Sequence, residues 1–261
     1  MLRFGMPALI EIDSLEESAA LCRELGLSFI ELNMNFPQYQ VGAVDISHLR
    51  EVAKKYGIFY TLHLDDHMNV ADFNPTVARA YADTVVDAVF LSKELGIPAI
   101  NMHLSRGGVV TLPDRKVYLF DQYRDAYLHQ IIKFRDRCQL AVGSSGIRIC
   151  VENTEGFLPW QQEAVETLLE SPVFGLTLDT GHDLCTGGGD LEFIQKHKDR
   201  LRHMHLHDAK QPNRDHLALG TGDMDLQARL DLAQACDCTV VLEIKTVQAL
   251  RDSTAWLRDN G

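Results

Sequence analysis

Four histidines, two aspartates and a lysine lie within about sixteen residues in the last third of the chain, between His203 and His216. This segment opens as a short strand pattern, Leu201–Leu206, and continues into polar sequence. Burial of apolar surface does not explain such a density of imidazole and carboxylate groups. A strand whose C-terminal end carries these groups is how a barrel enzyme presents metal ligands.

Other short apolar runs of the sequence also end on side chains that bind metals or move protons. Seven of eight predicted strands end in this way, at Glu31, His63, His103, Glu152, Asp179, His205 and Glu243. Taken singly, such a residue is more often a hydrogen-bonded packing residue, or the point where a strand leaves the core, than a ligand. The C-terminal strand ends of a parallel barrel converge on one face, so the repeated pattern favours a functional site.

Four of these residues, Glu152, Asp179, His205 and Glu243, end four successive strands and can face one point. Three carboxylates and one imidazole suit a divalent cation such as Mn²⁺, Mg²⁺, Co²⁺ or Zn²⁺. Without a cation, three converging carboxylates would repel one another and their pKa values would rise. We therefore predict that this quartet binds a divalent metal.

Four further histidines have two or three interpretations each. His63 and His103 are predicted as ligands of a second cation or as polar contacts to a substrate. His182 follows Asp179 by three residues, which fits a second metal, a substrate hydroxyl or a simple loop hydrogen bond. His216 lies on a loop that either folds over the barrel mouth or stays on the surface.

The remaining basic residues near the strand ends carry less information. Lys210 and Lys245 would neutralise an anionic substrate or lie in solvent. Six histidines are expected to be surface or packing residues: His48, His67, His129, His197, His203 and His207.

Short apolar runs alternate with helical-period segments along the whole chain, which predicts strands joined by crossover helices. The expected strands are Leu2–Met6, Ser28–Leu32, Phe59–Leu64, Ala99–Leu104, Ile147–Val151, Phe174–Leu178, His203–Leu206 and Thr239–Ile244. The expected helices are Leu15–Leu25, Ile46–Tyr56, Val77–Leu95, Lys116–Ala141, Gln161–Leu169, Leu191–His197, Leu226–Gln234 and Val247–Leu257. Gly57 and Gly96 follow two of these helices and are expected to end them.

Eight strand–helix units in 261 residues predict an α/β fold, a single (β/α)8 TIM barrel spanning residues 1–261 as one domain. No GxGxxG follows the first strand and no GxxxxGK[ST] occurs, so an open nucleotide-binding sheet is disfavoured. No linker, charge block or low-complexity tract indicates a domain boundary.

Composition excludes several classes of partner. The formal net charge of −12 disfavours binding that neutralises many nucleic-acid phosphates. Six scattered cysteines with no CxxC pair indicate reduced thiols in a cytoplasmic protein. The first residues meet Glu11 and Asp13 too soon for a signal peptide, and no apolar run is long enough for a membrane span.

These residues together resemble the xylose isomerase-like barrel superfamily, which holds sugar and sugar-phosphate isomerases and epimerases and the endonuclease IV branch of apurinic endonucleases. The motifs that carry the resemblance are Thr61-Leu62-His63, Asn101-Met102-His103, Val151-Glu152-Asn153, Leu178-Asp179-Thr180-Gly181-His182, Met204-His205-Leu206-His207-Asp208, the run from Asp215 to Gly222, and Leu242-Glu243-Ile244-Lys245.

The resemblance to the epimerase members implies a single-metal site made by the quartet. In those relatives the two glutamates, here Glu152 and Glu243, are the catalytic residues that exchange a proton with the carbon next to a carbonyl. The chemistry of these side chains agrees with that role, because a carboxylate on each face of a cation-bound substrate can remove and return the proton. His182 would then hold a substrate oxygen.

The resemblance to the endonuclease branch implies a different reaction, zinc-dependent cleavage of DNA at abasic sites. Its nine metal ligands match eight positions here: His63, His103, Glu152, Asp179, His182, His205, His216 and Glu243. The ninth, an aspartate, is replaced by Arg214, with Asp215 beside it, which puts a third metal in doubt. The segment 33–40 also lacks an arginine for insertion into DNA.

We therefore expect a metal-dependent isomerase or epimerase that acts on a small polyol, keto-sugar, sugar phosphate or inosose, with the abasic-site endonuclease as the alternative. A barrel that binds a sugar or metal without turnover is a third interpretation, and it has no need of two carboxylates beside a cation. No nucleic-acid or membrane partner is expected, and a homo-oligomer is compatible with the resemblance.

Overall fold

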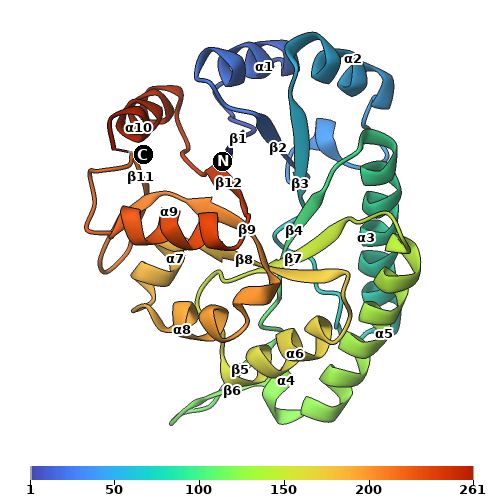
Figure 1. Cartoon of the computed structure of the whole chain (residues 1–261). Helices are drawn as coiled ribbons and strands as arrows, with labels where there is room; N and C mark the ends of the chain where they lie inside the picture. Colours follow the sequence, from blue (N-terminus) through green and yellow to red (C-terminus); the bar gives the residue numbers. More distant parts are fainter. Residues whose placement is uncertain (1, 261) are drawn as a thin grey trace.

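The computed structural model describes residues 2–260 and consists of eight parallel strands closed into a barrel and surrounded by helices (Figure 1). The barrel order is β1-β12-β9-β8-β7-β4-β3-β2. Its strands are β1 Arg3–Pro7, β2 Phe29–Asn33, β3 Phe59–His63, β4 Ala99–His103, β7 Arg148–Glu152, β8 Phe174–Asp179, β9 Leu201–Leu206 and β12 Thr239–Leu242. The predicted (β/α)8 TIM barrel is confirmed, and each predicted strand overlaps a barrel strand.

Helices cover the outside of the barrel and join successive strands (Figure 1). They are α1 Leu15–Glu24, α2 Ile46–Tyr56, α3 Pro75–Leu95, α5 Arg124–Val142, α6 Pro159–Leu169, α8 Gly189–Lys196, α9 Leu226–Ala235 and α10 Val247–Asn260. Shorter helices are η1 Pro37–Tyr39, α4 Leu119–Gln122, α7 Thr180–Cys185 and η2 Lys198–Arg200. No helix within residues 2–260 is long and apolar enough to span a membrane.

Local sequence explains where these helices begin and end. The Asp45 side chain accepts a hydrogen bond from the His48 backbone N–H and so caps the start of α2. Gly57 and Gly96 end α2 and α3 with φ of 63° and 68°, in the left-handed region that a side chain disfavours. Both helix ends agree with the prediction from the sequence.

Two antiparallel hairpins interrupt the regular alternation. The first pairs β5 Val109–Thr111 with β6 Lys116–Tyr118, and the second pairs β10 Asp208–Lys210 with β11 Arg214–Leu217. The predicted helix Lys116–Ala141 is therefore wrong at its start, because its first residues form β6 and the long helix α5 begins only at Arg124. The β-branched and aromatic pair Val117 and Tyr118 is better suited to a strand than to a helix.

The inside of the barrel is partly polar, and hydrogen bonds cross it between strands that are not neighbours. Glu31 on β2 accepts a hydrogen bond from His203 on β9, with 2.8 Å between Oε2 and Nε2. Thr177 on β8 donates to Asn101 on β4 over 2.6 Å. These bonds satisfy buried polar groups beneath the C-terminal end of the barrel.

Candidate metal centre and active site

The predicted quartet is brought together at the C-terminal end of the barrel. Glu152, Asp179, His205 and Glu243 each offer one ligand atom, and these atoms all lie within 4.8 Å of one another. The His205 Nδ1 atom lies 3.4 Å from Glu152 Oε1, 4.0 Å from Asp179 Oδ2 and 3.1 Å from Glu243 Oε2. Strand register explains the meeting of two of them, because Asp179 on β8 pairs directly with His205 on β9.

The donor atoms of this quartet fit a divalent cation. His205 Nδ1 and Glu243 Oε2 are both buried and make no hydrogen bond of acceptable geometry, although they face each other. Burial raises the pKa of the Glu243 carboxyl, but the His205 charge opposes it and holds that pKa well below its usual range. The predicted rise in carboxylate pKa is therefore wrong for Glu152 and Glu243, because the His205 ring lies between them. A buried, ionised oxygen without a hydrogen-bond donor, beside an imidazole nitrogen and two further carboxylates, fits the oxygen-rich donor set that divalent metals prefer.

A buried carboxylate holds the other side of the His205 ring. Glu31 Oε1 lies 2.8 Å from His205 Nε2, while Thr61 donates a 2.9 Å hydrogen bond to Glu31 Oε2. His203 contacts the same Glu31 oxygen and also Thr239 Oγ1, at 2.6 Å. Such a carboxylate orients a ligating histidine and raises its basicity. Glu31 therefore supports the site, and His203 is the packing residue that the sequence predicted.

His63 and His103 face Glu152 Oε2, whereas His205 faces Oε1 of the same carboxylate. Their Nε2 atoms are 3.5 Å and 3.3 Å from Glu152 Oε2. Burial lowers the pKa of His63, but a hydrogen bond and the charge of Glu152 outweigh it and raise that pKa to about 9. Both rings also face Asp66 Oδ1, at 3.7 Å. This geometry admits both sequence interpretations, a second cation or a polar contact to substrate.

His182 and His216 approach the quartet from the other direction. His182 Nδ1 is buried without a hydrogen bond, 3.4 Å from Asp179 Oδ2 and 3.7 Å from Glu152 Oε1. His216 lies on β11, and its Nδ1 is 3.0 Å from the Glu243 carbonyl oxygen. The predicted loop carrying His216 is therefore a hairpin folded against the mouth.

Sequence reasoning missed one residue of this group. His207 is expected from the sequence to be a surface or packing residue, yet its Nε2 lies 3.0 Å and 3.1 Å from the two carboxylate oxygens of Asp179. Its position two residues after His205 is a usable signal, because alternate residues of an extended strand point the same way.

The aspartate that would be the ninth ligand of an endonuclease-type site is only partly replaced in this chain. Arg214 is exposed, whereas the adjacent Asp215 places Oδ2 3.9 Å from His182 Nε2. The nearby Asp208 carboxylate instead accepts backbone N–H bonds from Ala209, Gly220, Gly222 and Met224. Asp208 thus shapes the loop after β11 and offers nothing to a metal.

A cavity of about 310 Å³ opens beside the quartet. Its lining combines an apolar wall from the β1 loop, Ala8 to Ile10, with Glu31, His63 and Glu243. Lys245 also lines it and places Nζ 2.7 Å from Glu243 Oε1. A space of this volume accommodates a small molecule whose oxygens reach the carboxylates and imidazoles.

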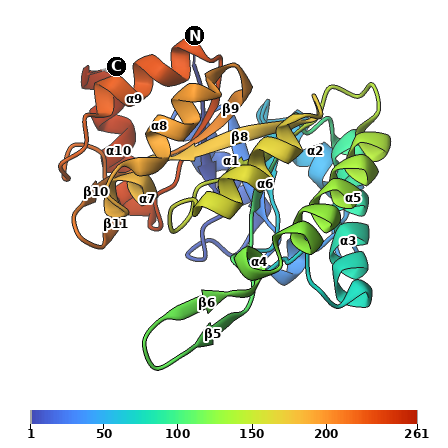
Figure 2. The same cartoon turned by 90° about the horizontal axis from the view of Figure 1, so that it is seen from below.

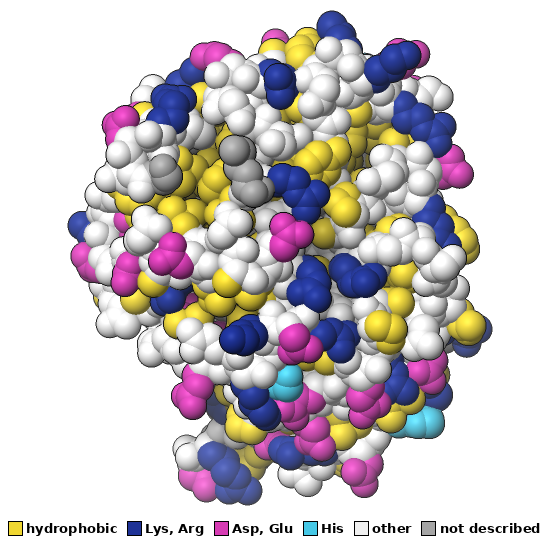
Figure 3. Space-filling view, viewed as in Figure 1, with side chains coloured by type: hydrophobic (Ala, Val, Ile, Leu, Met, Phe, Trp, Pro, Cys, Tyr) yellow, Lys and Arg dark blue, Asp and Glu magenta, His cyan; other side chains and the backbone are white. Residues whose placement is uncertain are grey.

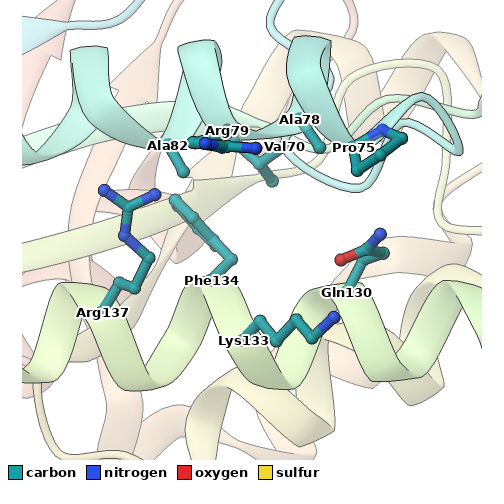
Figure 4. A pocket seen from close by; sticks show the side chains of 9 residues that line it. All are labelled: Val70, Pro75, Ala78, Arg79, Ala82, Gln130, Lys133, Phe134 and Arg137. Atoms are coloured by element: carbon teal, nitrogen blue, oxygen red, sulfur yellow. The ribbon is translucent and has the colours of Figure 1, made fainter.

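A second hollow lies outside the barrel, between α3 and α5 (Figure 4). Arg79, Lys133 and Arg137 project into it, and Arg137 is already paired with Asp83. Its lining has no carboxylate or imidazole, so it offers neither of the side-chain groups that make up the quartet. The face seen in Figure 3 likewise shows interspersed basic and acidic side chains and little histidine.

Comparison with known proteins places this geometry in a family. The family described as xylose isomerase-like TIM barrel matches residues 19–260. An uncharacterized protein of Methanocaldococcus jannaschii is 25% identical over 181 residues, and the alignment covers 67% of this chain and 66% of that protein, about two thirds of its length.

Two solved structures share the fold over nearly the whole chain. A D-tagatose 3-epimerase-like protein superposes with a TM-score of 0.81 and 22% identity, covering 99% of this chain and 96% of its own. The IOLI protein with a binding zinc atom gives a TM-score of 0.76 and 14% identity, covering 99% of this chain and 97% of its own. The chain belongs to the xylose isomerase-like TIM barrel family.

Proposed function

We propose that this protein is a divalent-metal-dependent isomerase or epimerase that moves a proton next to the carbonyl of a small polyol or keto-sugar. The observation that carries the proposal is a pair of buried carboxylates, Glu152 and Glu243, that flank His205 Nδ1 at 3.4 Å and 3.1 Å beside a small cavity. The similarity to a D-tagatose 3-epimerase-like protein supports this reaction class.

The quartet Glu152, Asp179, His205 and Glu243 would hold the cation, which is Mn²⁺, Mg²⁺, Co²⁺ or Zn²⁺. When bound there, a divalent cation polarises a substrate carbonyl and orients its neighbouring hydroxyl. The IOLI protein, which shares this fold, has a binding zinc atom, and this supports the proposal of a divalent metal here.

The two glutamates are the proposed catalytic bases and acids. Glu152 and Glu243 reach the site from β7 and from the end of β12, so each can take a proton from a different side of a bound substrate. Lys245 holds Glu243 Oε1 at 2.7 Å and so favours its ionised, proton-accepting form. His63, His103 and His182 are proposed to hold substrate oxygens.

Deuterium exchange tests this proposal. The purified protein, loaded with Mn²⁺ or Co²⁺, is incubated in deuterated water with a panel of ketoses and inososes, and deuterium at the carbon next to the carbonyl is measured. We expect Glu243→Gln to lower the exchange rate roughly 10²- to 10⁴-fold, because a positioned acid or base contributes that much. Glu51→Gln, on the exposed face of α2, is the matched control.

Unchanged exchange in Glu243→Gln would reject the assigned role. Retained ligand binding without exchange in the wild-type protein would instead favour a barrel that binds without turnover.

A zinc-dependent abasic-site endonuclease is the second candidate. It is favoured by His63 and His103, whose Nε2 atoms both face Glu152 Oε2, as ligands of a second cation would. Arg214 and the net charge of −12 weigh against it. Cleavage of an oligonucleotide with one abasic site, absent for the undamaged duplex, would favour this candidate over the epimerase.

A further inference from the structure

His207 is a fully buried histidine enclosed between a proposed metal ligand and the β10–β11 hairpin. One ring nitrogen, Nε2, lies 3.0 Å and 3.1 Å from the two oxygens of Asp179. The other, Nδ1, accepts a 2.8 Å hydrogen bond from the His216 backbone N–H. Both nitrogens are therefore used, and His207 has no free lone pair to offer a metal.

The His216 contact fixes where the His207 proton lies. Nδ1 also lies 3.4 Å from the Asp208 carbonyl oxygen, a longer contact than the 2.8 Å to the His216 N–H. Because a backbone N–H only donates, the shorter contact assigns the lone pair to Nδ1 and the hydrogen to Nε2. The Nε2–H group then donates to the Asp179 carboxylate. The His216 backbone has φ of 49°, uncommon for a residue with a side chain, which indicates that the surrounding contacts hold its N–H in this direction.

The contacts of Asp179 show what this donation achieves. Its Oδ1 caps α7 by accepting the His182 backbone N–H over 2.7 Å, while Oδ2 faces the quartet, 4.0 Å from His205 Nδ1. The His207 N–H lies against both oxygens and fixes the carboxylate plane. Gly181 makes room for the ring, since a Cβ there would lie 2.0 Å from His207 Cε1.

We propose that His207 is a positioning residue, which orients Asp179 for cation binding through a tautomer set by the β10–β11 hairpin. This inference rests on the metal centre of the proposed function. A hydrogen bond to a ligating carboxylate preorganises the ligand, and loss of such an outer contact weakens metal affinity roughly 10- to 100-fold.

Three substitutions of His207 distinguish the contact that Nε2 makes with Asp179 from the contact that Nδ1 makes with the His216 N–H. A glutamine amide reaches the place of Nε2 and can still donate to Asp179, whereas an asparagine reaches only the place of Nδ1. Leucine fills the space with no polar group. We expect His207→Leu and His207→Asn to weaken Zn²⁺ and Co²⁺ binding roughly 10- to 100-fold, and His207→Gln to stay within about threefold of wild type.

The metal alone is the probe, and affinity is measured by competition with a chromogenic chelator, so no substrate is needed. Gly181→Ala should weaken binding in the same direction, because it displaces the ring without removing it. Equal affinity in all three His207 variants and wild type would overturn the inference, and so would an equal loss in His207→Gln and His207→Leu. A wild-type protein that binds no cation would instead overturn the metal centre itself.

A measurement on the wild-type protein tests the inference even if the variants fail to fold. Heteronuclear NMR of histidine-labelled protein reports which ring nitrogen bears the hydrogen. The expected result is hydrogen on Nε2 of His207 with Nδ1 bare. Hydrogen on Nδ1, alone or in an imidazolium, would overturn the inference.

Discussion

Each of the two hairpins follows a barrel strand, β5–β6 after β4 and β10–β11 after β9, but the two hairpins contact different parts of the molecule. The β10–β11 hairpin packs against α7, and through His216 it reaches His207 and the Glu243 carbonyl. The β5–β6 hairpin projects from the body of the molecule (Figure 2), and Val109 and Val110 are 44% and 45% exposed at β5. One hairpin thus holds residues of the candidate site in place, whereas the other lies away from it.

Replacement of the β10–β11 hairpin should have the largest effect. Substituting residues 210–216 with a glycine–serine sequence of equal length keeps a backbone N–H at position 216 but removes the hairpin that aims it at His207, and it also deletes the His216 side-chain contact to Glu243. We expect metal affinity to fall at least roughly 10- to 100-fold, the range for loss of outer-shell contacts. Chelator competition measures this, and an unchanged affinity would remove the distinction between the hairpins.

A single substitution in the same hairpin should have an intermediate effect. His216→Ala deletes the 3.0 Å side-chain contact to the Glu243 carbonyl but keeps the backbone N–H that serves His207. One hydrogen bond contributes about 1 kcal/mol, so metal affinity should fall roughly fivefold. A loss as large as that of the whole hairpin replacement would show that the His216 side chain, rather than its backbone, supports the site.

The exposed hairpin should give the smallest effect. Val109→Thr with Val110→Thr replaces exposed apolar groups by isosteric polar ones and preserves strand propensity. The free energy of unfolding should change by less than about 0.5 kcal/mol, and metal affinity should not change. Thermal and denaturant unfolding, with the same chelator assay, check both values. A weakened metal site here would contradict the separation of the two hairpins.

The difference between the hairpins also marks how far sequence reasoning reaches. The eight strands and the quartet are predictable because barrel topology brings every C-terminal strand end to one face. Glu152, Asp179 and Glu243 stand out in sequence as carboxylates after apolar runs. Their convergence within 4.8 Å follows from their positions at the C-terminal ends of barrel strands, which the alternation of strands and helices already implies.

The parts that sequence reasoning misses depend on contacts outside the barrel. Strand β6 of the β5–β6 hairpin falls within the helix predicted from Lys116, although the long helix α5 begins only at Arg124. The role of His207 depends on the backbone direction at His216, nine residues later, and on the space left by Gly181. The spacing of His205 and His207 suggests that the two side chains point the same way, but the two contacts that define the role of His207 are not visible in a pattern of residue types.

The most direct test of the metal centre is the metal content of the purified protein after metal loading and desalting. Elemental analysis should find one divalent cation per wild-type chain and far less in Asp179→Asn, which keeps the shape of the side chain but removes the charge that faces His205. No bound cation in the wild-type protein, or equal content in Asp179→Asn, would contradict the central claim that the four strand ends form a metal centre.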